Sequence, residues 1–140
     1  MSTARENILI YIAAQVGAIT GLTVFRSREA AIARSEGAVL VLKPLEEQVV
    51  KIANEIALRE LHVTLTLIVR GVVPDSVADP YLAQITGLIQ SDTTLGGLAA
   101  RCIEKTTRWD MQVADLTALI VELTFLVKYL TPTASASLAS

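Results

Sequence analysis

Residues 61–70 read Leu61-His62-Val63-Thr64-Leu65-Thr66-Leu67-Ile68-Val69-Arg70 and alternate between apolar and mostly polar side chains. Because successive side chains of a β-strand point to opposite faces, this alternation predicts a strand with one apolar and one largely polar face. The stretch from Leu119 to Tyr129 alternates in the same way and predicts a strand about twice the usual length. We expect these two strands to lie side by side, and they decide the fold.

Two amphipathic helices are predicted before and after the first of these strands. Thr3 and Glu6 form a Thr-x-x-Glu capping box, which predicts a helix from about Ala4 to Ala18. Asp79-Pro80 predicts the N-cap and first residue of a second helix, which runs from about Pro80 to Gln90. The residues at helical spacing that we expect to face the core are Ile8, Leu9, Ile12, Ala13, Val16, Tyr81, Leu82, Ile85, Leu88 and Ile89.

Shorter strands are predicted near the start of the chain. Val24 to Arg26 and Ala38 to Leu42 are rich in β-forming residues, and Pro44 is expected to end the second of them. The charged segment between them, Ser27 to Gly37, is predicted to be a loop or a short helix.

The segment from Leu45 to Leu58 fits two different structures. The spacing of its apolar residues matches a helix, whereas the β-branched Val49, Val50 and Ile52, followed by Ala53-Asn54-Glu55, match a strand and a hairpin turn. We favour the hairpin.

Beyond the second helix, Leu95-Gly96-Gly97-Leu98 predicts a turn and Arg101 to Met111 a strand. The order helix, strands, helix, strands predicts an α+β fold: an antiparallel or mixed sheet of about four to six strands with two main helices packed on one face. One domain is expected over residues 1–131. The end of the chain, from Thr131 to Ser140, is rich in Pro, Ala, Ser and Thr, so residues 132–140 are predicted to form a disordered tail.

The composition narrows the classes of partner. Hydrophobic residues make up 52% of the chain and aromatic residues 4%, so the core must be aliphatic. Twelve basic and 14 acidic residues give a net charge of -2, which offers no overall attraction to nucleic acid or an anionic membrane. Cys102 is the single cysteine and cannot form an internal disulfide. The apolar run from Ile8 to Ala14 is far shorter than the roughly 20 residues of a membrane-spanning helix. We expect protein partners and no membrane.

Residues that could carry chemistry are few and scattered. His62, the only histidine, would have to serve any Ser-His-Asp or Cys-His catalysis, yet it lies mid-strand on the polar face. A lone strand cysteine such as Cys102 is typically a small buried hydrophobe. The pairs Glu46/Glu47 and Asp75/Asp79 lack a calcium loop or nearby histidines, and Gly96-Gly97 lacks the Lys-Ser/Thr of a phosphate-binding loop. We predict no catalytic residue, no cofactor and no metal site.

A basic cluster and a single tryptophan are further candidate binding features. Arg26, Arg28 and Arg34 have no stacking aromatic beside them except Phe25, which favours a solvated loop or salt bridges to a neighbouring subunit over nucleic-acid binding. Trp109 is expected to anchor the core or an interface.

The outward face of the last strand is not uniformly polar, because Ile120 and Leu126 stand among Glu122, Thr124 and Lys128. Aliphatic groups on a nominally solvated face indicate burial against another chain or against residues 45–58. The residues that we expect to form a subunit or tube interface are His62, Thr64, Thr66, Arg70, Ile120, Glu122, Thr124, Leu126, Arg26 and Arg28.

Five stretches in a fixed order carry a resemblance to a known family. They are the helix with Arg5-Glu6-Asn7-Ile8, the turn and strand Gly21 to Arg28, the strand ending Leu67-Ile68-Val69-Arg70-Gly71, the turn Thr94 to Ala99, and the strand ending Phe125-Leu126-Val127-Lys128-Tyr129 before Thr131-Pro132. Over about residues 3–132 the chain resembles the tail terminator family, the tail-completion or minor tail proteins of long-tailed, lambda-like phages. Such proteins place a hairpin at residues 45–58, where this sequence reads more helical.

The resemblance implies a structural protein of the phage or prophage virion and not an enzyme. It implies a homo-oligomeric ring, commonly a hexamer, that caps the finished tail tube, ends tail polymerisation and offers a surface to a head-completion protein. The ring would assemble in the bacterial cytoplasm and become part of the virion tail, with DNA only passing through its hole. The exposed face or edge of the sheet would pack against neighbouring subunits, and a closed ring of head-to-tail contacts suits that role.

Three other functions remain open at this point. One is a different neck or connector protein of a phage or phage-derived particle. Another is a small α+β enzyme whose site forms between subunits. The third is a bacterial protein-binding adaptor, which would be a stable monomer.

Overall fold

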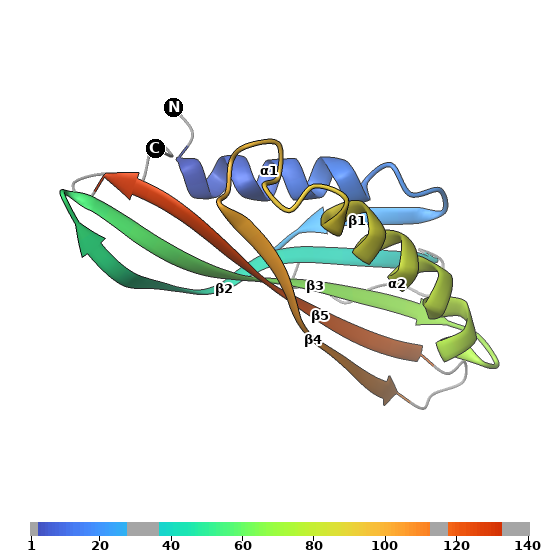
Figure 1. The fold of residues 1–140 in the computed structure, drawn as a ribbon. Coiled ribbons are helices and arrows are strands. Elements are labelled where there is room, and N and C mark those ends of the chain that lie inside the picture. The colour runs from blue at the N-terminus through green and yellow to red at the C-terminus, as the bar shows by residue number, and fades with distance from the viewer. Residues whose placement is uncertain (1–2, 28–36, 113–117, 133–140) are drawn as a thin grey trace.

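The computed structural model describes residues 3–27, 37–112 and 118–132, which form two helices and a five-stranded mixed sheet (Figure 1). In chain order the elements are α1 (Ala4–Val16), β1 (Leu22–Arg26), β2 (Ala38–Ala53), β3 (Ile56–Arg70), α2 (Pro74–Gln90), β4 (Arg101–Gln112) and β5 (Ala118–Pro132). The predicted α+β class is confirmed. None of the helices in the described ranges has both the length and the apolar character needed to cross a membrane.

The two long strands identified from the sequence form the centre of the sheet. Its order is β1-β2-β3-β5-β4, with β1 parallel to β2 and the other neighbours antiparallel. β3 and β5 pair residue for residue from Ile56 and Pro132 at one end to Arg70 and Ala118 at the other. The expectation that they lie side by side is therefore confirmed, and both exceed the stretches that alternation marked.

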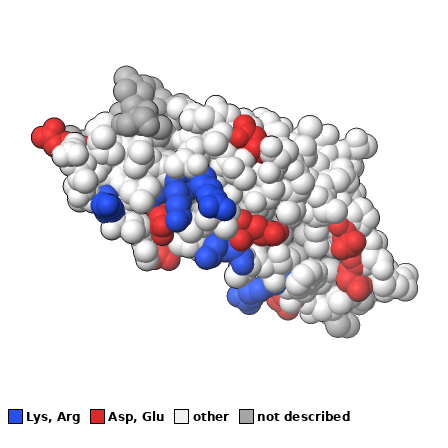
Figure 2. Space-filling model, in the orientation of Figure 1, with Lys and Arg blue, Asp and Glu red and all other residues white. Residues whose placement is uncertain are grey.

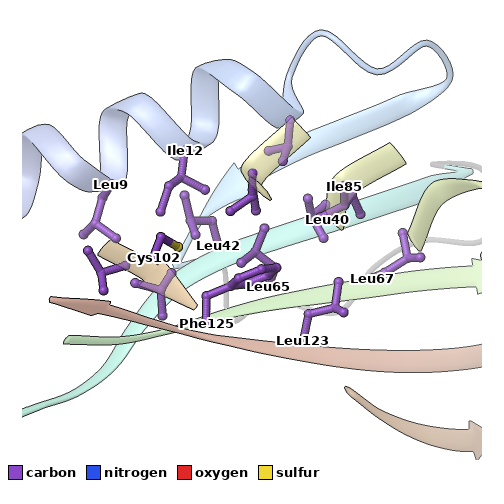
Figure 3. Close-up of a cluster of buried hydrophobic side chains, with 14 of the residues drawn as sticks. Leu9, Ile12, Leu40, Leu42, Leu65, Leu67, Ile85, Cys102, Leu123 and Phe125 are labelled. Atoms are coloured by element: carbon purple, nitrogen blue, oxygen red, sulfur yellow. The ribbon is translucent and has the colours of Figure 1, made fainter. Parts of the chain in front are cut away.

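Both helices cover one face of the sheet, which we call the helix face. The core lies between the helices and this face (Figures 1 and 3). Ile8 and Ile12 of α1 and Ile85 of α2 are fully buried against the helix face, where Leu65 and Phe125 meet them. Apart from Phe125, Tyr129 and partly buried tyrosines, the core is aliphatic, as the low aromatic content requires. We call the opposite side the second face.

Helix α1 begins where the capping residues predict. The Glu6 backbone N–H donates to Thr3 Oγ1 at 3.1 Å, which is one half of the capping box. The Glu6 carboxylate does not complete the box; it accepts two hydrogen bonds from Arg26, at 3.0 and 3.1 Å. Glu6 therefore links α1 to the end of β1.

Helix α2 begins six residues before the predicted start at Pro80. Pro74 occupies the first turn, where its missing N–H costs nothing, and Pro80 lies inside the helix. An interior proline leaves the carbonyl four residues earlier, on Ser76, without its helical donor. Pro74 and Ala78 are both buried, so packing of the first two turns offsets that loss.

Strand β2 does not end at Pro44, as the sequence had suggested, but continues to Ala53. Within the described residues β1 flanks it only as far as Leu42, so Pro44 lies where β2 is an edge strand and its missing N–H breaks no ladder. The segment from Leu45 to Leu58 is a hairpin, which confirms the favoured interpretation. Asn54 and Glu55 both have positive φ, 52° and 64°, as the two central residues of a type I′ turn do.

The predicted turn at Leu95-Gly96-Gly97-Leu98 is present in the connection between α2 and β4. Asp92 accepts hydrogen bonds from the backbone N–H groups of Thr94 and Gly96, both at 3.0 Å. Gly96 has φ +69°, and a Cβ there would lie 2.9 Å from the Tyr11 ring. Both the backbone angle and the close approach to α1 therefore require glycine.

Strand β5 ends at Pro132, the first residue of the predicted tail. β5 includes Thr131 and Pro132, and Thr131 is completely buried rather than part of a tail. Residues 133–140 lie outside the described residues, as do residues 28–36 of the segment between β1 and β2, with Arg28 and Arg34.

Candidate functional site

The β2–β3 hairpin extends past α1 at one end of the molecule (Figure 1). We call residues 45–58 the distal hairpin. Leu45 is 61% exposed and Ile52 is 65% exposed. The exposed large apolar residues of the distal hairpin are Leu45, Val49, Val50, Ile52 and Ile56. Such a concentration of exposed aliphatic groups is unusual for a monomer and is typical of an interaction surface.

The apolar residues of the distal hairpin do not share one face. Register shifts lie between Pro44 and Glu46 and between Val49 and Lys51, so Leu45 and Val50 are extra residues of β-bulges. Beyond them, Ile52 pairs with Ala57, whose side chain belongs to the helix face, while Ile56 lies on the second face. The distal hairpin therefore offers aliphatic groups on both sides.

A polar cluster anchors the base of the distal hairpin to α1 and β5. Glu47 accepts hydrogen bonds from Arg5 Nε at 3.1 Å and from Arg59 Nη1 at 3.2 Å, and also from the Tyr129 hydroxyl. Arg59 Nε donates in turn to Thr131 Oγ1 at 2.8 Å. Tyr129 and Thr131 are fully buried, so this network forms the boundary between the core and the hairpin.

The pKa shifts in this cluster follow from burial and from these hydrogen bonds. Burial alone would raise the pKa of Glu47, but the hydrogen bonds from Arg5 and Tyr129 outweigh it and lower that pKa below its ordinary value. Burial, with the hydrogen bond to Glu47, raises the pKa of Tyr129 to about 12. Near neutral pH the cluster therefore holds a charged carboxylate among two guanidinium groups and a neutral phenol.

Sequence reasoning missed this cluster. Arg59 has the same parity as Leu61 and Val63, so a charge on the core side was visible in the alternation. The bulge at Leu45 reverses the parity of β2, which hid the fact that Glu47 lies on the helix face.

Eight of the ten proposed interface residues form one continuous group on the second face. The register pairs His62 with Leu126, Thr64 with Thr124, and Thr66 with Glu122, and it pairs the neighbouring Ile68 with Ile120. All of these side chains are buried or half-buried within the single chain, and Thr64 is 2% exposed. His62 Nδ1 and Thr64 Oγ1 are buried without a hydrogen-bond partner among the described residues.

The two arginines proposed for the interface do not join this group. Arg26 lies at the end of β1 on the helix face, where it pairs with Glu6. Arg28 is among the residues that the structure does not describe.

The two residues weighed for nucleophilic catalysis, Cys102 and His62, lie on opposite faces of the sheet. Cys102 pairs with Val127 on the helix face, whereas His62 lies on the second face, so the sheet separates thiol and imidazole. Burial raises the pKa of Cys102 to about 11, which keeps the thiol protonated near neutral pH. In the described ranges, no three His, Cys, Asp or Glu side chains gather as a metal site would require.

A second group of exposed apolar residues lies at the opposite end of the molecule, where β3 leads into α2 and β4 ends (Figure 1). We call it the far-end patch: Val72, Val73, Val77, Trp109 and Met111. Val72 is 93% exposed and Trp109 58% exposed. A hollow of about 490 Å³ lies beside Trp109 and is lined by Asp75, Ser76, Asp79 and Pro80. Trp109 is thus a surface residue, which excludes the core role considered for it.

Neither a scan against protein-family models nor a search of curated proteins finds a match to this chain.

Proposed function

We propose that this chain is a structural assembly protein of a long-tailed phage or prophage, which forms a ring of identical subunits and caps the tail tube. The sequence resemblance described above supports the phage assignment. The observation that carries the assembly role is the distal hairpin, which exposes five large aliphatic residues and whose turn extends past α1 at one end of the subunit.

The form of the distal hairpin favours contact through side chains rather than through strand addition. Within the described residues, β2 is an unpaired edge beyond Leu42, and this edge carries Lys43, Pro44, Lys51 and two bulges, all of which oppose pairing with another strand. Its aliphatic groups remain available for packing in a pocket or against a flat surface. This combination suits a subunit that forms a defined ring without growing into an open sheet.

The proposed mechanism is a geometrical one and involves no covalent chemistry. A ring whose tube-binding surface lies on one side only stops the polymerisation of the tail tube when it binds. The other side of the ring then receives the head-completion protein. Because the net charge is small and negative, the ring would not bind strongly to the phosphates of DNA that passes through its hole.

A capping assay with purified tail tubes tests this function. Tubes elongated from free tube protein should stop growing when the purified chain is added, and electron microscopy should show a ring at one end. If tubes keep growing at a saturating concentration of the chain, and no ring is bound to them, the terminator function is excluded. Sizing by light scattering separates the rival adaptor, which stays monomeric.

A further inference from the structure

The described part of the subunit carries apolar surfaces at two opposite ends, the distal hairpin and the far-end patch. β3 extends from one to the other, and its 15 residues place them on the order of 45 Å apart. A contact in which the same surface meets itself would use only one of these ends. Two different surfaces at opposite ends fit a head-to-tail contact, which repeats from subunit to subunit.

A groove at one end and a hollow at the other carry opposite charges, and the exposed Glu46 and Glu55 of the distal hairpin do not line that groove. The distal hairpin carries Lys51, which lies exposed beside Ile56, Leu58 and Leu130 in a shallow apolar groove. The far-end hollow carries Asp75 and Asp79, and Figure 2 shows acidic side chains at the end of the molecule where α2 begins. Within the described ranges no recorded salt bridge involves any of these three charges.

The far-end hollow has the chemistry that receives a cation surrounded by aliphatic groups. Two carboxylates one helical turn apart provide the countercharge, and Trp109, which lines the same hollow, supplies an aromatic ring of the kind that makes cation–π contacts. Val72, Val73 and Val77 add exposed aliphatic surface at the same end of the molecule. A lysine flanked by isoleucine and leucine side chains, as on the distal hairpin, is opposite in charge to the hollow and brings apolar groups to an end that exposes valines.

We propose that the distal hairpin of one subunit docks in the far-end hollow of the next, with Lys51 between Asp75 and Asp79 and against Trp109. The occupant is a second copy of this chain. This inference rests on the proposed ring and identifies the surfaces that build it.

Charge reversal at either end tests the contact in the full chain. Lys51→Glu and the double variant Asp75→Lys/Asp79→Lys should each weaken self-association at least tenfold by light scattering or sedimentation. An equimolar mixture of the two variants should restore assembly, because each then offers the charge that the other lacks. Lys43→Glu, an exposed lysine of the same strand outside the distal hairpin, is the matched control and should leave assembly unchanged. Circular dichroism of each variant verifies folding.

Trp109 supplies an independent readout because it is the only tryptophan. Assembly should shift its fluorescence to shorter wavelength and reduce its quenching by acrylamide, and Lys51→Glu should abolish both changes. Assembly that leaves Trp109 as exposed as before, or that survives both charge reversals, would overturn the proposed contact.

Failure of this contact can be separated from failure of the proposed function. If the ring caps tubes and its assembly is unchanged by the charge reversals, the proposed contact is wrong and the proposed function is unaffected. If the charge reversals weaken self-association but the assembled chain does not bind tubes, the proposed function is wrong and the proposed contact is unaffected. A chain that stays monomeric at all concentrations contradicts both.

Discussion

The two halves of the β2–β3 ribbon use similar residues for different purposes. From Leu61 to Arg70, β3 lies under both helices, and its alternate leucines and valines are completely buried. In the distal hairpin, six of 14 residues are valine, leucine or isoleucine, and five of these six remain exposed. The covered half stabilises the subunit, whereas the uncovered half is available for contacts between subunits.

The boundary between the halves is set by charge rather than by apolar packing. Arg5 at the start of α1 reaches Glu47 of β2, and Arg59 reaches both Glu47 and the end of β5. A partly buried carboxylate that is fully hydrogen-bonded holds a fixed geometry, because each lost partner leaves another group unsatisfied. We infer that the cluster fixes the direction in which the distal hairpin leaves the core.

The largest expected effect comes from opening a cavity in the covered half. Phe125→Ala removes a completely buried ring at the centre of the helix face and should lower the free energy of unfolding by about 3–5 kcal/mol. Ile52→Ala, in the distal hairpin, should change it by less than about 0.5 kcal/mol. Urea denaturation of the dilute chain measures both. Equal losses would mean that the halves do not differ in the way described.

The next effect should come from the boundary cluster. Glu47→Gln keeps the shape of the side chain but removes the charge that Arg5 and Arg59 share, and should cost about 1.5–3 kcal/mol. Its neighbour Glu46 is exposed on the second face, so Glu46→Gln is a matched control with an expected change below about 0.5 kcal/mol. If both variants unfold at the same urea concentration, the cluster contributes nothing to stability.

The contribution of Glu47 should also depend on pH. The folded state lowers the pKa of Glu47, so its stabilising contribution is fully present above the ordinary value of 4.5 and is lost as pH falls through the lowered value. The stability difference between the unaltered chain and Glu47→Gln should therefore narrow below pH 4.5. The pH dependence of Glu47→Gln is to be compared with that of Glu6→Gln. Hydrogen bonds from Arg26 also lower the pKa of Glu6, but this side chain lies at an exposed site. A constant difference between pH 7 and pH 3 for Glu47→Gln would contradict this assignment.

Alternation predicted the covered half of the sheet well because burial on one face imposes a period of two. The pairing of β3 with β5 followed from the sequence, and so did the buried faces of Ile8, Ile12 and Ile85. The distal hairpin was harder to predict. Its bulges at Leu45 and Val50 break the period, and its exposed aliphatic residues match a helix as well as a strand.

The remaining errors have local physical causes. Proline was taken as a boundary at both Pro44 and Pro80, but an unpaired edge tolerates the first and the buried start of α2 offsets the second. Asp75, Asp79 and Trp109 come together only because α2 begins early and β4 ends beside it. No spacing in the sequence links residues that lie about 30 positions apart on different elements.

The smallest expected effect concerns the turn of the distal hairpin and is a gain in stability. Glu55 has φ +64°, a backbone conformation that costs a residue with a Cβ about 1 kcal/mol and that glycine adopts freely. Glu55→Gly creates the Asn-Gly pair preferred in type I′ turns, although glycine also gains entropy in the unfolded chain. The net stabilisation should therefore be about 0.5 kcal/mol, measured by urea denaturation.

Glu55→Ala separates backbone strain from the effect of removing a charge, because alanine keeps the strained backbone and should bring no gain. The turn lies away from the core, so relief of its strain should leave the covered half unchanged, and amide hydrogen exchange should slow in the distal hairpin alone. Equal stabilisation by alanine and glycine would show that charge, and not the left-handed turn, limits the stability of the uncovered half.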